Sequence, residues 1–273
     1  MKPLRSLVNG RAEAGLSVTS RLQYGDGVFE TVAVQDGRLL LWSEHGRRLA
    51  TGAERLGLEP VEPISLKAEA EDLAAGLGLA ILKVVLVRGA AGRGYRPGAA
   101  PTDRILTTWP WPSGQRFEEG APVFWCKTRL ARQPLLAGIK HLNRLEQVLA
   151  QREFADPYWE GVMQDTQDWV IEGTMTNLFV VEQGALATPI LDQAGVAGVM
   201  RERVVVRARE LGIGVHFDRL TKSRVMEADE VFLCNSVIGA RPVLDLGNGS
   251  RRRGPITTMI EEALRGGRDA VVL

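Results

Sequence analysis

Two ionisable side chains stand in apolar surroundings and together suggest carbonyl chemistry. Lys140 lies in LAGIKHLNRLEQ, after a turn of small residues and between Ile139 and Leu142. An amine held among apolar side chains loses hydration, which favours the uncharged form that attacks carbonyl groups. Glu172, in DWVIEGTMTNLFVV, follows a strand-like run, so its carboxylate requires a cationic partner. A protonated pyridine nitrogen is one such partner, because the pairing strengthens the ring as an electron sink.

A phosphate site is suggested by a helix start further along the chain. Gly195 and Gly198 precede a helix predicted to begin near Val199. Small residues and free backbone N–H groups at a helix start can hold a phosphate without a side-chain charge. Arg48, on an earlier predicted helix, could supply a matching charge. Each of these patterns alone also fits an ordinary role: a lysine along a helix, a turn glutamate, a loop-to-helix junction or a surface arginine.

Other catalytic chemistries lack support in the sequence. His45, His141 and His216 share no HxxxH or HExxH spacing, so no metal site is predicted. Cys126 and Cys234 are far apart and lie in the apolar runs VFWCK and VFLCN, which predicts buried core thiols. No GxSxG sequence occurs, so a serine nucleophile elbow is not predicted.

Composition restricts the class of protein and its partners. The 273 residues can form one large domain or two modest ones, and 45% hydrophobic with 25% charged residues is typical of a globular protein. A formal net charge of +1 favours neither nucleic acid nor an anionic membrane as a partner. The opening MKPLRSLVNG lacks the apolar stretch of a signal peptide, and no apolar segment reaches the length of a membrane span. We therefore expect a cytoplasmic protein.

The elements that must position these residues begin with a hairpin. Residues 27–34 and 38–42 read as strands joined by the turn Gln35-Asp36-Gly37. Ser43 is predicted to cap a helix that runs to about residue 55. The further elements predicted here are a helix over 65–77, a strand over 82–88, a glycine-rich loop over 89–98 and a strand over 104–109.

Composition changes at residues 110–120, which are rich in Pro, Gly and charge. We predict an N-terminal domain over 1–112, a linker over 113–120 and a C-terminal domain over 121–273. A helix over 143–154, capped by Asn143, is predicted to bury Leu145, Val148 and Leu149. The other elements predicted in this half are a strand over 123–127, two strands within 160–181 around a turn at 165–168, a helix over 199–211 and a strand over 230–233. This order fits two α+β domains with antiparallel or mixed sheets.

Taken together, these segments resemble the fold type IV pyridoxal 5'-phosphate (PLP) enzymes, which include branched-chain aminotransferase, D-amino-acid aminotransferase and aminodeoxychorismate lyase. Five motifs carry the resemblance, in the family's order over nearly the whole chain. They are YGDGVFET (24–31), HGRRL with Arg48, the Lys140 segment, Glu172 with Asn177 in TNLF, and the Gly198 helix start followed by Asn235-Ser236 in CNSVIGARPV.

The resemblance implies a fold, a cofactor and an assembly. The fold would be a small N-terminal α/β sandwich with a larger C-terminal α/β pseudo-barrel. PLP would form a Schiff base with Lys140, and Glu172 would pair with the pyridine nitrogen. The other residues implied to contact PLP are Arg48, Asn177, Gly198, Val199, Met200, Asn235 and Ser236. The resemblance also implies a homodimer.

Within the family, three segments resemble the lyase members. AGIKHLNRLEQVLA places His141 and Asn143 close after the lysine, GRGYRP lies in the glycine-rich loop, and LDQAGVAGVMRE has Met200 where aminotransferases generally have threonine. The implied substrate is 4-amino-4-deoxychorismate and the implied products are 4-aminobenzoate and pyruvate. GVFET is shared with the aminotransferases, so a D-amino-acid or branched-chain aminotransferase stays an alternative. A PLP-free regulator or scaffold on the same fold is a more remote one.

The lyase resemblance also implies roles near the substrate. The amine of Lys140 would act as general base, and Thr31 would donate a proton to the departing pyruvate. Because the substrate carries two carboxylates, cationic side chains should line its pocket. The residues that we predict to contact substrate are Tyr24, Arg88, Arg93 and Arg96.

Overall fold

The computed structural model describes residues 2–12, 15, 20–90, 94–112, 120–247, 249 and 252–265. The chain divides into two compact units, Met1–Ser113 with Ile139–Asn143, and Gly114–Gly138 with Arg144–Leu273. The predicted linker, except Gly120, and the predicted substrate residue Arg93 lie outside the described residues. The five residues around Lys140 belong to the first unit, although they follow the predicted linker in sequence.

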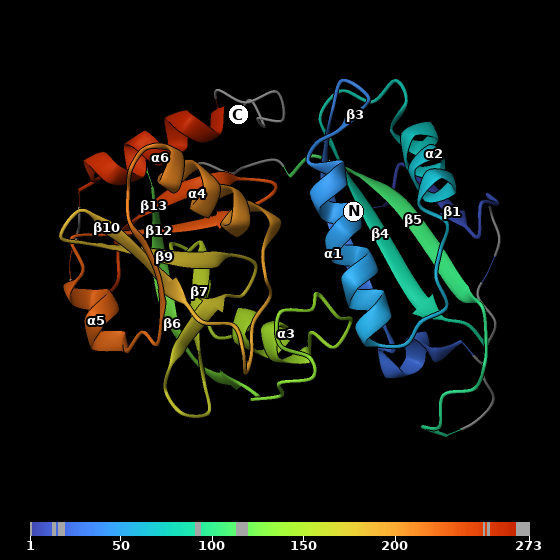
Figure 1. The fold of residues 1–273 in the computed structure, drawn as a ribbon, viewed down its shortest axis with the longest axis horizontal. Coiled ribbons are helices and arrows are strands. Elements are labelled where there is room, and N and C mark those ends of the chain that lie inside the picture. The colour runs from blue at the N-terminus through green and yellow to red at the C-terminus, as the bar shows by residue number, and fades with distance from the viewer. Residues whose placement is uncertain are drawn as a thin grey trace. The chain divides into compact units, whose positions relative to one another are not determined.

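The first unit is built on a five-stranded antiparallel sheet with the strand order β1-β5-β4-β2-β3 (Figure 1). Its strands are β1 (Arg5–Val8), β2 (Gly27–Gln35), β3 (Arg38–Leu39), β4 (Ala80–Arg88) and β5 (Thr102–Pro110). The predicted hairpin is confirmed, because Asp36 and Gly37 adopt the positive φ angles of 49° and 74° that a two-residue turn requires. The second strand is shorter than predicted and ends at Leu39.

The helices of the first unit pack on one face of this sheet. They are α1 (Trp42–Arg55) and α2 (Pro63–Ala74); the short 3-10 helix η1 (Arg21–Tyr24) precedes β2 in the chain. Val28, Val32 and Val34 alternate along β2 and form a core with Leu49 of α1 and Leu66 of α2. The alternation makes Glu30 the one polar member of the inward face of β2, between Val28 and Val32.

The predicted helix caps differ from those observed. Ser43 does not cap α1: buried Leu41 precedes the helix in a left-handed conformation with φ 55°, so the chain turns directly from β3 into Trp42. The second helix starts before Ser65, because the Glu62 carboxylate caps it by accepting from the N–H groups of Ile64 (3.0 Å) and Ser65 (2.5 Å).

The second unit contains an eight-stranded mixed sheet with the order β11-β10-β9-β12-β13-β6-β7-β8. Its strands are β6 (Ala121–Leu130), β7 (Glu160–Asp165), β8 (Val170–Gly173), β9 (Asn177–Glu182), β10 (Ala185–Pro189), β11 (Val215–Asp218), β12 (Glu230–Asn235) and β13 (Gly239–Asp245). Its helices are α3 (Leu145–Gln151), α4 (Val199–Glu210), α5 (Lys222–Glu227) and α6 (Pro255–Arg265). The pairs β10/β11, β13/β6 and β6/β7 are parallel and the others antiparallel. Two α+β units are thus confirmed.

Residues 160–181 contain β7, β8 and most of β9, whereas two strands were predicted. The predicted turn is present, with Asp168 N–H bonded to the Asp165 carbonyl. A second turn at residues 173–176 separates β8 from β9 and was not predicted, because its threonines read as strand residues.

The predicted burial of α3 is wrong. Leu145, Val148 and Leu149 are 69%, 54% and 44% exposed, while Gln147 and Ala150 face inward. The helix begins only at Leu145, and Asn143 does not cap it; the Asn143 amide instead donates to the Gly25 carbonyl at 3.2 Å in the first unit. The connections at the two ends of a short helix decide which face is buried. In α3 the buried face is the less apolar one.

The two cysteines are core thiols, as predicted. Cys126 and Cys234 are buried and free, and burial raises the pKa of each to about 12. In the part of the chain that the structure describes, no helix has both the length and the apolar character to cross a membrane.

Candidate active site

Lys140 lies beside the start of β2. The Phe29 N–H donates to the Lys140 carbonyl and the Leu142 N–H to the Gly27 carbonyl, both at 2.9 Å. Ile139 points into the core of the first unit. The half-buried side chain of Lys140 lies over the Phe29 ring, with its Nζ 4.5 Å from the ring centroid. Backbone bonds and a buried neighbour therefore fix the position of the amine.

Thr31 follows Phe29 on the same face of β2, because side chains two apart on a strand share a face. It is half-buried and stands opposite Lys83 of β4. The Lys83 Nζ lies 5.3 Å from the Phe29 centroid, so two amines contact one ring. Lys83 was not predicted, although a charged residue near the start of the apolar run LKVVLV was a signal for it.

Arg48 projects from α1 and forms a bidentate ion pair with Glu30. Its Nε donates to Glu30 Oε1 at 2.7 Å and a terminal nitrogen to Oε2 at 2.5 Å. His45, one turn earlier, lies with Nδ1 2.6 Å from Glu30 Oε2. Burial alone would raise the pKa of Glu30, but the charge and hydrogen bonds of Arg48, with those of His45, lower it to about 2. An ionised glutamate thus fixes the predicted phosphate arginine.

In the second unit of the chain, Glu172 and Asn177 both bond the backbone of Val196. The Val196 N–H donates to Glu172 Oε2 at 2.8 Å, and the Asn177 amide donates to the Val196 carbonyl at 2.9 Å. Both side chains are buried. Because Glu172 lies on β8 and Asn177 on β9, the loop that contains Val196 is held against two strands.

The start of α4 has the backbone of an anion site. Gly198 precedes the helix, and no side chain among the described residues caps it, so a bound anion could accept from the first-turn N–H groups. A Cβ on Gly198 would overlap Asn177 Oδ1, which makes glycine a steric requirement. Val199 and Met200, which follow it, are buried.

Asn235 ends β12 and organises the turn that contains Ser236. Its side-chain oxygen accepts from the N–H groups of Val237 (2.9 Å) and Ile238 (3.0 Å). Its amide donates to the Met175 carbonyl at 3.2 Å. Ser236 is half-buried in this turn.

Tyr24 lies next to the glycine-rich loop. Its ring meets that of Tyr95 edge to face, with centroids 5.4 Å apart. The buried Arg21 holds the loop in place, because its guanidinium donates to the carbonyls of Gly94 (2.9 Å) and Tyr95 (3.1 Å). Arg96 follows on the same loop and is exposed.

The guanidinium of Arg88 is hydrogen-bonded within the fold of the first unit. It donates to Asp26 Oδ2 at 2.9 Å and to the carbonyls of Gly57 (2.8 Å) and Leu56 (2.7 Å). Arg21 contacts the same Asp26 Oδ2 at 2.8 Å. Burial and these acceptors give Arg88 a structural role within the fold, and its contact with substrate stays a prediction. Chemistry and loop position could not distinguish it from Arg96.

The residues within each unit fit PLP. The first unit presents an amine, Lys140, and a guanidinium, Arg48, that Glu30 fixes in place. The second presents a buried carboxylate, Glu172, and the start of α4 after Gly198, which no side chain of the described residues caps. A carboxylate can accept from a pyridinium N–H, an amine can bond an aldehyde carbon, and the N–H groups of a helix start can donate to a phosphate.

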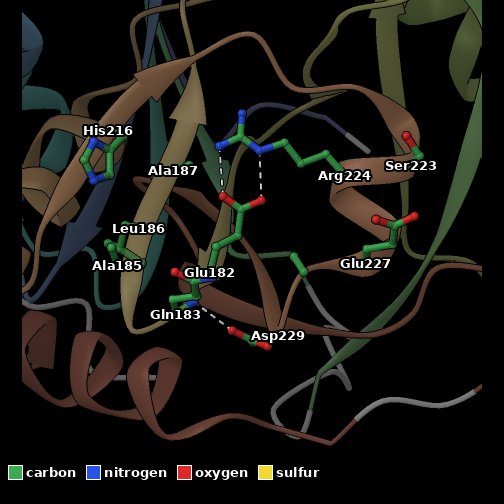
Figure 2. Close-up of a pocket in the computed structure, with 11 residues that line it drawn as sticks. Glu182, Gln183, Ala185, Leu186, Ala187, His216, Ser223, Arg224, Glu227 and Asp229 are labelled. Carbon is green, nitrogen blue, oxygen red and sulfur yellow. Dashed lines mark hydrogen bonds and ion pairs between the residues drawn. The ribbon is translucent and has the colours of Figure 1, made fainter.

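A separate hollow of about 630 Å³ lies between the β9–β10 hairpin, β11 and α5 (Figure 2). In it, Arg224 bonds both oxygens of Glu182 at 2.8 Å and Asp218 at 2.6 Å. None of the predicted site residues lines this hollow, and its central charges are paired with one another. Nor do the described residues contain a group of histidine, cysteine or acidic side chains suited to a metal ion.

Comparison with known proteins matches residues 27–246 to the model of the amino-transferase class IV family. The aminodeoxychorismate lyase of Vibrio harveyi is 36% identical over 86% of this chain and 89% of its own. The crystal structure of 4-amino-4-deoxychorismate lyase from Pseudomonas aeruginosa is 42% identical, with a TM-score of 0.92 over 97% of this chain and 99% of that one. The branched-chain amino acid aminotransferase of T.th., solved with pyridoxamine 5'-phosphate, is 26% identical with a TM-score of 0.83 over 97% and 94%.

These likenesses confirm the fold expected from the sequence motifs: a small antiparallel N-terminal sheet with a larger mixed C-terminal half-barrel, which is fold type IV. The family match, which extends over most of the chain and includes β2, Lys140, Glu172 and the start of α4, settles the membership. The chain belongs to the class IV aminotransferase family.

Proposed function

We propose that this protein is a PLP-dependent aminodeoxychorismate lyase that converts 4-amino-4-deoxychorismate to 4-aminobenzoate and pyruvate. The observation that carries the choice of reaction is the contrast in similarity. Identity is 42% to a lyase structure and 26% to an aminotransferase structure, each over 97% of the chain. The residues that fit PLP support the cofactor.

In this proposal each cofactor residue has one role. Lys140 Nζ would hold the aldehyde carbon, and Glu172 would pair with the pyridine nitrogen and keep it protonated. Arg48 and the N–H groups of Val199 and Met200 would bind the phosphate. Asn177, Asn235 and Ser236 would complete the surroundings. When bound, PLP supplies an electron sink for the carbanion formed at the substrate carbon next to nitrogen.

The chain's own residues would then move two protons. Lys140 Nζ removes the proton from the ring carbon that bears the substrate amine, and the carbon–oxygen bond to the enolpyruvyl group breaks as the ring becomes aromatic. Thr31, on the same face of β2 as Phe29, would donate a proton to the departing group, which leaves as pyruvate. The atoms of the substrate are thereby divided completely between 4-aminobenzoate and pyruvate.

Substrate binding would use the glycine-rich loop of the first unit. Arg96, with Arg93, would pair with the substrate carboxylates, and Tyr24 would contact the substrate beside Tyr95. The exposed guanidinium of Arg96 supports this choice over the buried Arg88.

We also propose a homodimer. The exposed apolar side chains of α3, Leu145, Val148 and Leu149, support an assembly surface, because such groups rarely cluster on a monomer without a function. Light scattering of the purified protein should give twice the mass of one chain.

The reaction is tested by product analysis. Purified protein loaded with PLP and given 4-amino-4-deoxychorismate should release pyruvate and 4-aminobenzoate in equal amounts. Transfer of amino groups from D-alanine or a branched-chain amino acid to 2-oxoglutarate, without pyruvate release from aminodeoxychorismate, would make it a transaminase. A protein whose visible absorbance does not change with PLP would instead be a PLP-free regulator or scaffold.

A further inference from the structure

Glu160, at the start of β7, is fully buried and surrounded by neutral donors. Its Oε1 accepts from the N–H groups of Gly161 (2.9 Å) and Thr174 (3.1 Å) and from the Thr174 hydroxyl. Its Oε2 accepts from the Met175 N–H and the Thr176 hydroxyl, both at 3.0 Å. Among the described residues no cation pairs with this carboxylate.

The donors come from one turn. Residues 174–176 connect the end of β8 to the start of β9, and all three donate to Glu160. Gly173, which begins the turn, could not carry a side chain, because a Cβ would overlap the Thr176 hydroxyl and press on the Glu160 carboxylate. The turn is therefore wrapped closely around one side chain.

This turn lies between residues of the proposed cofactor site. Glu172 immediately precedes Gly173, and Asn177 immediately follows Thr176. Asn235 also donates to the turn, at the Met175 carbonyl. A shift of the turn would therefore move Glu172, the carboxylate proposed for the pyridine nitrogen, together with Asn177 and Asn235.

A buried carboxylate without a cation is costly, and burial raises the pKa of Glu160 despite the hydrogen bonds that lower it. An apolar side chain would fill the space without this cost, so the gain must lie in what the carboxylate orders. What it orders is the backbone of a single turn.

We propose that Glu160 is a positioning residue for the cofactor site, and that it acts by fixing the 173–176 turn and through it Glu172 and Asn177. The inference rests on the proposed use of PLP. Glu160 itself would touch neither cofactor nor substrate. Removing the Glu160 carboxylate should lower the affinity for PLP, with a smaller effect on the thermal stability of the apoprotein.

The test compares Glu160→Gln with a matched control, Glu153→Gln. Glu153 likewise accepts from two successive backbone N–H groups, of Lys127 (2.5 Å) and Thr128 (2.7 Å), and from the Thr128 hydroxyl, but it orders β6 instead. For wild type and both variants, one would measure the melting temperature of the apoprotein, its rise on PLP addition, and the PLP dissociation constant from the visible absorbance.

We expect Glu160→Gln to weaken PLP binding about tenfold, the equivalent of one hydrogen bond to a charged group. The rise in melting temperature on PLP addition should be smaller than in wild type. Glu153→Gln should lower the apoprotein melting temperature and bind PLP like wild type. Unchanged PLP binding by Glu160→Gln, or equal weakening in both variants, overturns the inference. If wild type itself does not bind PLP, the proposed function fails first, and the inference with it.

A milder pair keeps the test decisive if Glu160→Gln does not fold. Thr176→Val removes the hydrogen bond that the Thr176 hydroxyl donates to Glu160, and Thr128→Val removes the corresponding hydroxyl bond to Glu153. The first should weaken PLP binding about fivefold, the equivalent of one neutral hydrogen bond, and the second should leave it unchanged. Equal PLP affinity in these two variants would also overturn the inference.

Discussion

Glu30 in the first unit and Glu160 in the second are both buried in strands, yet their surroundings differ. Glu30 meets a guanidinium and an imidazole, and the pKa of its carboxyl falls to about 2. Glu160 meets only N–H and hydroxyl groups, and its pKa rises. At Glu160 the hydrogen bonds do not offset the loss of hydration, whereas at Glu30 the adjacent guanidinium and imidazole do. Glu30 therefore locks a charged side chain, Arg48, while Glu160 orders a backbone turn.

The largest expected effect comes from Glu30→Gln. The change leaves Arg48 and His45 without their anion inside the fold, which should lower the free energy of unfolding by about 3–5 kcal/mol. Urea denaturation at neutral pH measures it. Glu62→Gln, which weakens the exposed cap of α2, is the control and should cost much less, because water can replace the lost acceptor there. Equal losses in the two variants would show that the Glu30 pair does not matter.

The two carboxylates should respond to pH with opposite signs. Glu30 has a folded pKa below its ordinary value of 4.5, so its stabilisation is complete above pH 4.5 and lost as the pH falls toward 2. Glu160 has a raised pKa, so its contribution is most favourable below its ordinary pKa and declines as the pH rises above it. Unfolding free energies from pH 7 to pH 3 should show the gap between wild type and Glu30→Gln narrowing, and the gap for Glu160→Gln moving the other way. Parallel pH dependences would refute the contrast.

A smaller effect is expected at Asp26, where the same rule applies to two arginines. Arg88→Met removes the four hydrogen bonds that Arg88 donates in the fold, yet Asp26 keeps Arg21, so a loss of about 2 kcal/mol in stability is expected. Its KM for aminodeoxychorismate should stay close to that of wild type. The matched variant Arg96→Met should change stability by less than about 0.5 kcal/mol and raise KM. A raised KM in Arg88→Met with an unchanged KM in Arg96→Met would instead support Arg88 as the substrate contact.

Strong local patterns in the sequence predicted much of the fold. Asp36-Gly37 determines a hairpin turn through backbone preference, and Gly198 marks the start of α4. The predicted site residues of the second unit also follow the family motif, and the structure shows Glu172 and Asn177 joined through Val196. Their roles toward PLP stay predictions.

What the sequence could not predict depends on contacts distant in the chain. Glu30 reads as one glutamate in a strand until α1 brings Arg48 against it, although its place among alternating valines was a signal. Glu160 carries no such signal, because its partners in the unpredicted turn follow it by 14–16 residues. The exposure of Leu145 on α3 reverses what apolar periodicity favours, since periodicity identifies a face but not what covers it.

Lys140 is proposed to hold PLP, and visible absorbance reports that bond. Wild-type protein and Lys140→Ala would be titrated with PLP and their visible absorbance spectra recorded, with Lys83→Ala as the control because that amine also contacts Phe29. We predict that wild type and Lys83→Ala gain the visible absorbance of protein-bound PLP and release pyruvate from aminodeoxychorismate, and that Lys140→Ala does neither. The same absorbance in Lys140→Ala, or its loss only in Lys83→Ala, would contradict the assignment.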